Sequence, residues 1–184
     1  MAIDVYAADE QADRTIDLAR WARLARIVLR DRRVRGDVEV SLLFVDEEAI
    51  AALNEQFLGR QGPTDVLAFP IEDEAVVGGR SPDMGGRGPG DDAGDVPLTL
   101  LGDVVICPAV ASRNAGEHRA DDDDELALLV VHGLLHLLGM DHETDPDAER
   151  MEAVERDLLA RHHRPVNREG TADPEGTADR GGTR

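Results

Sequence analysis

Apolar residues recur along the chain with two periodicities, one typical of strands and one typical of helices. Short alternating or β-branched apolar runs predict strands at residues 2–7, 37–45, 64–71 and 98–107. Apolar residues spaced three and four apart predict helices at residues 15–31, 46–58, 108–119, 121–138 and 146–163. The order of these elements predicts an α+β fold, a single domain with a central mixed sheet of about four strands packed by about five helices.

Two segments lack this apolar pattern. Residues 72–96 are rich in Gly, Asp and Pro, and they have almost no large apolar side chain after Gly78. Such a composition buries too little surface to offset the entropy cost of ordering, so a flexible acidic loop is predicted. Residues 164–184 are polar and glycine-rich and are predicted to form a disordered tail. Residues 1–163 are predicted to form one domain with a sizeable core, with residues 72–96 as a loop within it.

Charge is distributed unevenly along the chain. The formal net charge of −19 by itself argues against a nucleic-acid partner, because phosphate binding usually needs a basic surface. Arginines nevertheless crowd between Arg20 and Arg35, where only Asp31 is acidic, and the chain has no lysine. A solvated face of the first helix is the simplest interpretation of these arginines, and a contact with RNA is the alternative.

The sequence also gives an expectation for the cellular compartment of the protein. The N-terminal residues have neither the apolar core of a secretory signal nor an Arg-rich, acid-poor character, and no apolar run is long enough to cross a membrane. We therefore expect a cytoplasmic protein with no membrane partner. The single cysteine, Cys107, excludes an internal disulfide, and its apolar surroundings favour a buried, inert thiol.

Three histidines, His132, His136 and His142, lie in the stretch VVHGLLHLLGMDHE at residues 130–143. His132 and His136 are four residues apart, so a helix would project both from one face, about 6 Å apart along its axis. This helix is apolar nearly all round and is therefore expected to be buried. Two buried imidazoles need partners for their ring nitrogens, and one shared metal ion satisfies both.

The third histidine requires a change in chain direction. If the helix continued, His142 would lie about 15 Å beyond His132, too far for Zn–N bonds of about 2 Å. Gly139 offers a left-handed helix cap that would turn His142 toward the same metal. Three protein ligands leave a fourth position for water, as in catalytic zinc sites. We predict one zinc ion here, with nickel, copper or iron as alternatives, against the interpretation of three unrelated histidines.

The residue after His132 separates this pattern from zinc peptidases, whose motif has a glutamate base at that position. Here it is Gly133, which can neither take a proton from a metal-bound water nor give one to a departing amine. Water on zinc has a pKa lowered to about 7 and can still act on an ester with a less demanding leaving group. A phosphodiester fits this description better than a peptide.

With these residues the sequence resembles the YbeY family of bacterial endoribonucleases, which act in ribosomal RNA maturation and ribosome quality control. The resemblance rests on VVHGLLHLLGMDHE, on LNEQFLGRQGPTDVLAFP at residues 53–70 and on LLGDVVIC at residues 100–107, in the family's order. It covers about residues 3–163. It implies an α+β fold, one zinc held in a cleft by the three histidines, and cleavage of single-stranded RNA.

The second of these motifs departs from the family at one position. Many members have an arginine, to which activity is attributed, two residues before the position of Arg60, and this chain has Leu58 there. Arg60 remains as the neighbouring cation. The resemblance makes Arg60 the candidate catalytic residue, for contact with phosphate or with the charge of the transition state.

Carboxylates near the histidines are candidates for orienting a metal-bound imidazole. Asp65 precedes one predicted strand and Asp103 lies inside another, and turn or capping duty is the alternative for Asp65. Asp141 and Glu143 flank the third histidine and are interpreted as solvated. The other histidines carry no spacing signal and are predicted to lie at the surface; they are His118, His162 and His163.

Three functions from different classes remain open. The first is a zinc-dependent, single-strand-specific endoribonuclease of ribosomal RNA maturation, whose partners would be single-stranded or ribosomal RNA and the ribosome or its small-subunit proteins. The second is a ribosome-associated assembly factor in which the metal is mainly structural, favoured by Leu58 and by the acidic charge. The third is a peptidase or other small-molecule hydrolase, which Gly133 disfavours.

Overall fold

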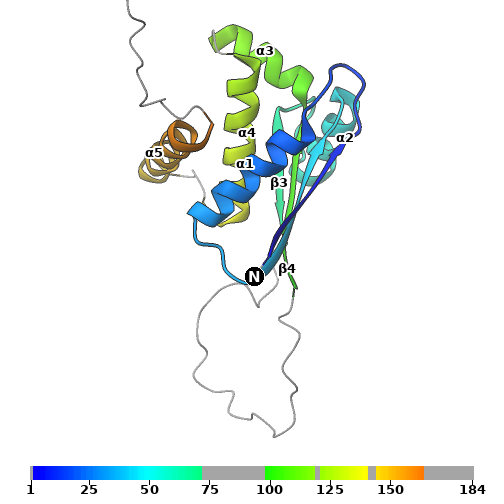
Figure 1. The fold of residues 1–184 in the computed structure, drawn as a ribbon. Coiled ribbons are helices and arrows are strands. Elements are labelled where there is room, and N and C mark those ends of the chain that lie inside the picture. The colour runs from blue at the N-terminus through cyan, green and yellow to red at the C-terminus, as the bar shows by residue number, and fades with distance from the viewer. Residues whose placement is uncertain (1, 72–97, 119–120, 141–143, 164–184) are drawn as a thin grey trace, which may run out of the picture.

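The computed structural model describes residues 2–71, 98–118, 121–140 and 144–163 (Figure 1). Its strands are β1 (Ile3–Asp9), β2 (Asp37–Phe44), β3 (Val66–Pro70) and β4 (Leu98–Ile106). Its helices are α1 (Leu18–Asp31), α2 (Glu47–Leu58), α3 (Pro108–His118), α4 (Asp122–Leu137) and α5 (Asp145–His162). Each predicted strand and helix is present, so the predicted fold class is confirmed. The predicted acidic loop and the predicted tail lie outside the described residues.

The strands form one mixed sheet in the order β1-β2-β4-β3. β1, β2 and β4 are parallel, and β3 pairs antiparallel with β4 at the edge. Because parallel neighbours cannot be joined by a tight turn, α1 makes the crossover from β1 to β2 and packs back on the sheet. The edge position of β3 leaves one of its sides open, and the cleft described below lies beside it.

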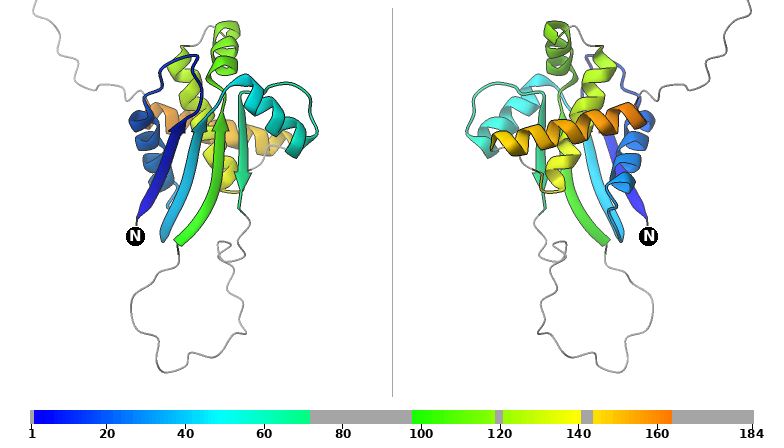
Figure 2. Two further views of the ribbon diagram at one scale, coloured as in Figure 1. Left: turned by 90° about the vertical axis from the view of Figure 1, so that its right-hand side faces the viewer. Right: turned by 90° about the vertical axis from the view of Figure 1, so that its left-hand side faces the viewer.

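Helices cover the two faces of the sheet unequally (Figure 2). α1 and α4 lie on one face, and α5 crosses their outer side. α2 lies on the other face, above a small apolar cluster that includes Ile50, Leu67 and Cys107. Cys107 is fully buried, as predicted, and this burial raises the pKa of its thiol. Among the described helices, none has both the length and the apolar character needed to cross a membrane.

The contact between α4 and β4 is unusually close at one glycine. A β-carbon added at Gly133 would lie 2.4 Å from Cγ1 of Val104, a distance that real β-carbons do not reach. Val104 is fully buried and cannot move aside freely. Only a residue without a side chain therefore lets α4 approach the sheet this closely. The same contact leaves no space for a glutamate at position 133.

A cluster of charged side chains holds α5 against α1. Asp31, the last residue of α1, accepts a hydrogen bond from Arg161 near the end of α5. Nε2 of His162 lies 3.3 Å from Oδ1 of the same carboxylate. The Arg161 guanidinium holds the pKa of Asp31 below its ordinary value. The position of α5 matters because this helix also contributes to the candidate site.

His163 holds α5 against α4 as well. Its Nε2 lies 2.9 Å from Oδ1 of Asp124, and its ring is stacked on Trp21 with centroids 6.3 Å apart. The side chains of His162 and His163 are only 21% and 7% exposed. The prediction that these two histidines lie at the surface is wrong for the buried side chain of His163, and His162 is half-buried; both dock the last helix. The side chain of His118 lies outside the described part of the chain.

Candidate metal centre

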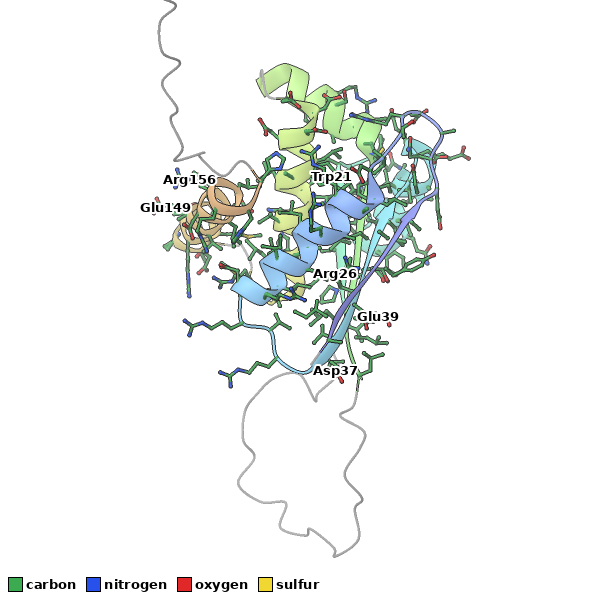
Figure 3. All side chains as sticks on the ribbon, viewed as in Figure 1. Trp21, Arg26, Asp37, Glu39, Glu149 and Arg156 are labelled. Atoms are coloured by element: carbon green, nitrogen blue, oxygen red, sulfur yellow. The ribbon has the colours of Figure 1, made fainter. Side chains whose placement is uncertain are left out.

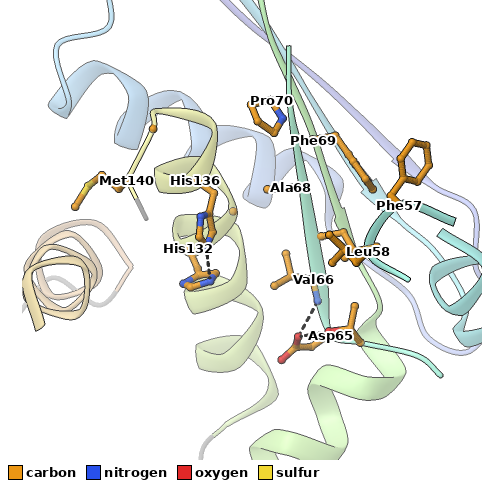
Figure 4. A pocket seen from close by; sticks show the side chains of 14 residues that line it. Phe57, Leu58, Asp65, Val66, Ala68, Phe69, Pro70, His132, His136 and Met140 are labelled. Carbon is orange, nitrogen blue, oxygen red and sulfur yellow. Dashed lines mark hydrogen bonds between the residues drawn. The ribbon is translucent and has the colours of Figure 1, made fainter. Parts of the chain in front are cut away.

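His132 and His136 face one another near the end of α4 (Figure 4). Their Nε2 atoms are 3.1 Å apart, and their rings meet edge to face with centroids 4.6 Å apart. Two nitrogens bound to one zinc at about 2.0–2.1 Å in tetrahedral geometry would be about 3.3 Å apart. The two side chains thus have nearly the separation that a shared metal ion requires.

Glu155 on α5 orients His132. Its Oε1 lies 2.7 Å from Nδ1 of His132, and its side chain is only 10% exposed. A carboxylate here accepts the Nδ1–H of the imidazole, which leaves the Nε2 lone pair on the side that faces His136. Histidines that bind metals are commonly oriented in this way. The pairing also satisfies a carboxylate whose burial would otherwise be costly.

The end of α4 has the predicted left-handed cap. Gly139 has a φ of +77°, and its N–H donates to the carbonyl three residues earlier at 2.9 Å. The N–H of Met140 donates to the carbonyl of Leu135 at 3.0 Å, which completes a Schellman motif. Residues 141–143, which include the predicted ligand His142, lie outside the described residues. Within the described residues no three His, Cys, Asp or Glu side chains are grouped to hold a metal, so the third ligand stays a prediction.

A cleft of about 660 Å³ opens between α4 and β3, and we call it the histidine cleft. The histidine pair and Gly133 line one side, and residues 64–70 line the other (Figure 4). The last two residues of α2, Phe57 and Leu58, complete the lining together with the cap of α4. The volume lies within the range of about 300–1,000 Å³ that is typical of ligand sites.

The end of α2 gives the histidine cleft an apolar rim. Phe57 and Leu58 are 57% and 53% exposed. The ring of Phe57 packs edge to face against that of Phe69 on β3, with centroids 4.9 Å apart. Exposed aromatic and apolar side chains beside a polar site offer a surface on which flat apolar groups can stack.

Asp65 lines the histidine cleft, but its carboxylate serves the fold. Oδ2 accepts a hydrogen bond from Nδ2 of Asn114 at 2.9 Å, and Oδ1 accepts one from the backbone N–H of Val66 at 2.8 Å. The first bond attaches the start of β3 to α3, and the second caps the start of β3. The structure therefore agrees with the turn and capping interpretation of Asp65.

Asp103 lies on the wrong face of the sheet to orient a histidine. Its neighbour Val104 faces Gly133 on α4, and successive residues of a strand point to opposite faces. Asp103 accordingly points away from α4. The outer partner that the described residues provide for His132 is Glu155, which the sequence interpretation missed.

A signal for Glu155 was nevertheless present in the sequence. Met151, Glu155 and Leu158 follow helical spacing, and all three are buried on the inner face of α5. A carboxylate at an apolar position of an amphipathic helix requires a polar partner on the element that it faces. The sequence does not say which element that is, because it contains no information on how α5 docks.

Comparison with known proteins identifies the family. The family model for "Endoribonuclease YbeY" matches residues 6–163. The chain belongs to the YbeY family. Relatives of that name include one from Frankia alni, 40% identical with 95% of this chain and 91% of the relative covered. Another, from Thermobifida fusca, is 40% identical with 92% and 99% covered, and one from Beutenbergia cavernae is 44% identical with 79% and 88% covered.

A solved structure agrees with the fold of this YbeY-family chain. The solution structure of TM1509 from Thermotoga maritima matches with a TM-score of 0.52 and 24% identity, covering 95% of this chain and 100% of that one. At this level of identity the likeness supports the fold alone.

Leu58 and Arg60 differ in their relation to the histidine cleft of this YbeY-family chain. Leu58 lines the cleft, so the position at which the resemblance predicts an arginine faces it. Arg60 follows Gly59, the left-handed cap of α2, and it is exposed and does not line the cleft. A catalytic role for Arg60 stays a prediction.

Proposed function

We propose that this chain is a zinc-dependent, single-strand-specific endoribonuclease that acts in ribosomal RNA maturation and ribosome quality control. The observation that carries the proposal is the pair of imidazole Nε2 atoms 3.1 Å apart, with His132 bound to Glu155, on the wall of the histidine cleft. Membership of the YbeY family supports RNA as the substrate, because the relatives are named endoribonucleases.

The donor set fits zinc. His132 and His136 would hold the ion, with His142 as the predicted third ligand, and imidazole nitrogens are among the ligands that zinc prefers. The carboxylate behind His132 is the outer partner that such a ligand normally has. When bound, zinc supplies a Lewis acid and a nucleophile that is activated at neutral pH.

The chain's own residues prepare this site. Glu155 keeps the proton of His132 on Nδ1, so Nε2 is the nitrogen available to the metal. Gly133 allows α4 to lie close to β4, which sets the histidine pair at the wall of the cleft. Position 133 offers no general base and no proton for an amine leaving group. This supports cleavage of a phosphodiester over cleavage of a peptide.

The apolar rim supports a preference for single strands. Phe57 and Leu58 present exposed surface at the histidine cleft, and the partly buried Phe69 packs against Phe57. Bases can stack on such side chains only when they are not already paired and stacked in a duplex. The Arg60 guanidinium lies just beyond this rim in sequence and would approach phosphates of the same strand.

We further propose a cytoplasmic location, with ribosomal RNA and the ribosome or its small-subunit proteins as partners. The support is the resemblance in sequence to a family that acts in ribosomal RNA maturation, together with membership of that family.

One observation favours a second function, that of a ribosome-associated assembly factor in which the metal is mainly structural. Leu58 faces the histidine cleft at the position where the resemblance predicts an arginine. In that case removal of the metal should lower the melting temperature sharply. Ribosome association should then return with any metal that accepts tetrahedral coordination.

The proposal is tested by cleavage of a labelled single-stranded RNA by metal-free protein, with and without added zinc. The same RNA annealed to its complement tests strand specificity, and His136→Ala, with its fold verified by circular dichroism, is the control. We expect products only from the single strand, only with zinc and only with the wild-type protein. A folded, zinc-loaded wild type that leaves the RNA intact would contradict the proposal. Leu58→Arg would then be the first variant to assay.

A further inference from the structure

A second hollow lies at the opposite edge of the sheet from the histidine cleft. It has a volume of about 300 Å³ and is lined by Ile3, Arg30, Arg33, Val34 and Arg35. We call it the arginine pocket. It is formed where the C-terminal end of α1 meets the start of β1, the edge strand farthest from β3. Three of its five lining residues are therefore cationic, in a chain with a net charge of −19.

The guanidinium groups of the arginine pocket, those of Arg30, Arg33 and Arg35, have no hydrogen-bond or ion-pair partner within the described residues. The neighbouring carboxylates are engaged elsewhere. Asp31 binds Arg161, and Asp37 accepts the N–H of Ala2 at 2.6 Å.

Other arginines of the same region have structural partners. Arg20 pairs with Asp123 on α4 at 2.5 Å, and its guanidinium lies 4.6 Å from the centroid of the Trp21 ring. Arg26 donates to the backbone carbonyl of Val5 at 3.4 Å. The arginine-rich segment thus divides into residues that hold the fold together and residues that do not. The pocket contains the second kind.

The backbone of the pocket is strained at Arg33. Its φ is +60°, and it is the one non-glycine residue with a positive φ in the described part of the chain. The N–H of Val34 donates to the carbonyl of Leu29 at 3.1 Å, as in the Schellman motif that normally ends with glycine. An L-residue with a side chain is disfavoured here. Glycine would relieve this strain, so its absence motivates the hypothesis that the Arg33 side chain has a function.

The helix dipole explains only part of this cluster. A cation in the last turn of a helix is favourable, which accounts for Arg30. Arg33 and Arg35 lie beyond the end of α1, where that effect has fallen off. Three open guanidinium groups around one hollow repel one another, and an anion between them would remove this repulsion.

We propose that the arginine pocket binds phosphate groups of the single-stranded RNA that enters the histidine cleft. The inference deepens the proposed function and rests on it. The planar guanidinium donates in pairs to phosphate oxygens, which suits an arginine cluster better to phosphate than to an isolated carboxylate. Such contacts position a strand without reading its sequence.

The lateral spacing of the two edge strands is short enough for a few nucleotides of one RNA strand to cross the sheet. β1 and β3 are separated by three interstrand steps of about 4.8 Å, or about 14 Å in total. Even at the duplex rise of about 3.4 Å per nucleotide, a strand of about four nucleotides spans that distance. Figure 3 shows Asp37 at the same end of the sheet as the start of β1, and Arg156 on α5, away from that end. Arg156 therefore serves as a control position.

The test measures RNA affinity against salt concentration with a fluorescent single-stranded RNA, in a His136→Ala background to prevent cleavage. The test variant combines Arg30→Gln, Arg33→Gln and Arg35→Gln. The control variant makes the same change in net charge at three exposed arginines elsewhere, Arg113→Gln, Arg150→Gln and Arg156→Gln.

Loss of three phosphate contacts should make the slope of log affinity against log salt shallower by about 2, at about 0.7 per phosphate for a single strand. At low salt the pocket variant should bind at least about tenfold more weakly, and the control should keep a slope close to that of the wild type. If RNA affinity fell equally in both variants, the effect would come from long-range electrostatic attraction and not from a binding site. That result would overturn the inference. So would an unchanged slope in the pocket variant, which would leave an acidic protein surface as the occupant.

Arg33→Gly adds a readout that a purely structural role cannot imitate. Release of the backbone strain should raise the melting temperature by about 2–4 °C, while the salt slope becomes shallower by about 0.7. A variant that gains stability and keeps full RNA affinity would contradict a phosphate contact at Arg33.

The two proposals can fail separately. If the wild type neither binds nor cleaves single-stranded RNA, the proposed function fails, and the inference fails with it. If the wild type binds and cleaves the RNA but the pocket variant does so with the same affinity and salt slope, only the arginine pocket is excluded.

Discussion

The histidine cleft and the arginine pocket lie at opposite edges of one sheet. They differ in whether their polar side chains have partners within the described residues. In the cleft, His132 is bound by Glu155, and Asp65 is bound by Asn114. In the pocket, the side chains of Arg30, Arg33 and Arg35 have no hydrogen bond or ion pair within the described residues.

This difference indicates two kinds of binding. A metal ion requires nitrogens at fixed separations, so its ligands must be held by other protein groups before it arrives. A phosphate chain is long, flexible and uniformly charged, and mobile guanidinium groups can follow it without fixed geometry. Under the two proposals, the histidine cleft would hold a metal ion in fixed geometry and the arginine pocket would hold phosphates mainly by charge. Variants at the two regions should therefore change RNA cleavage and RNA affinity separately.

His132→Ala should have the largest effect on the comparison. It removes a predicted metal ligand, so cleavage of single-stranded RNA should fall to background. This loss is larger than the about 10–100-fold that is typical when a residue that only orients a metal ligand is replaced. RNA affinity, measured by fluorescence anisotropy, should stay near the wild-type value, because the arginine pocket is intact. If affinity falls together with activity in a protein that circular dichroism shows to be folded, then the histidines hold the RNA themselves.

Glu155→Gln should have the next largest effect. The amide keeps the shape of the side chain but accepts the Nδ1–H of His132 more weakly, so zinc affinity and cleavage rate should each fall by about 10–100-fold. Zinc affinity can be measured by competition with a chromophoric chelator. Glu152→Gln, at an exposed position of the same helix, is the matched control. Equal losses in both variants would show that Glu155 has no special link to the metal.

Gly133→Ala tests the packing that supports the cleft. The added β-carbon would lie 2.4 Å from Val104, so the variant should lose about 1–3 kcal/mol in urea unfolding. Gly116→Ala on α3, where nothing lies within 4 Å, should be neutral or should gain about 0.5–1 kcal/mol. Adding Val104→Ala should recover part of the loss at Gly133. The packing account would be wrong if both glycine variants behaved alike.

Acid should loosen the docking of α5, and this is the smallest expected effect. Arg161 holds the pKa of Asp31 below its ordinary value of 3.8, so the contribution of Asp31 to stability is present above that pH. It is lost as the pH falls through the lower, folded-state pKa. Asp31→Asn should cost less than about 1 kcal/mol at pH 7 and should flatten the acid side of the stability curve. Parallel curves for variant and wild type down to pH 2 would contradict this assignment.

The fold was predictable because its signals are local. Trp21, Leu24, Ala25 and Val28 show the buried face of α1 by spacing alone, and all four are buried. The histidine pair was predictable for the same reason, since a separation of four residues on a helix fixes a common face. The cap at Gly139 depends on backbone conformation within one turn, and it too was predictable.

The remaining features depend on packing between distant segments. Glu155 reaches His132 from a helix whose docking is set by Asp31 and His163, and no local spacing encodes that arrangement. The need for glycine at position 133 arises from the register of α4 over Val104. Sequence alone correctly indicated that a base is missing there, but not that the space for one is missing too.

The most direct test of the central claim is a zinc titration of the metal-free protein, with bound zinc determined by native mass spectrometry and cleavage of single-stranded RNA measured at each point. The account predicts that activity rises in proportion to bound zinc and reaches its plateau at one zinc per chain, and that His136→Ala shows neither effect. Full cleavage by the metal-free protein, or a fully zinc-loaded wild type that leaves the RNA intact, would contradict it.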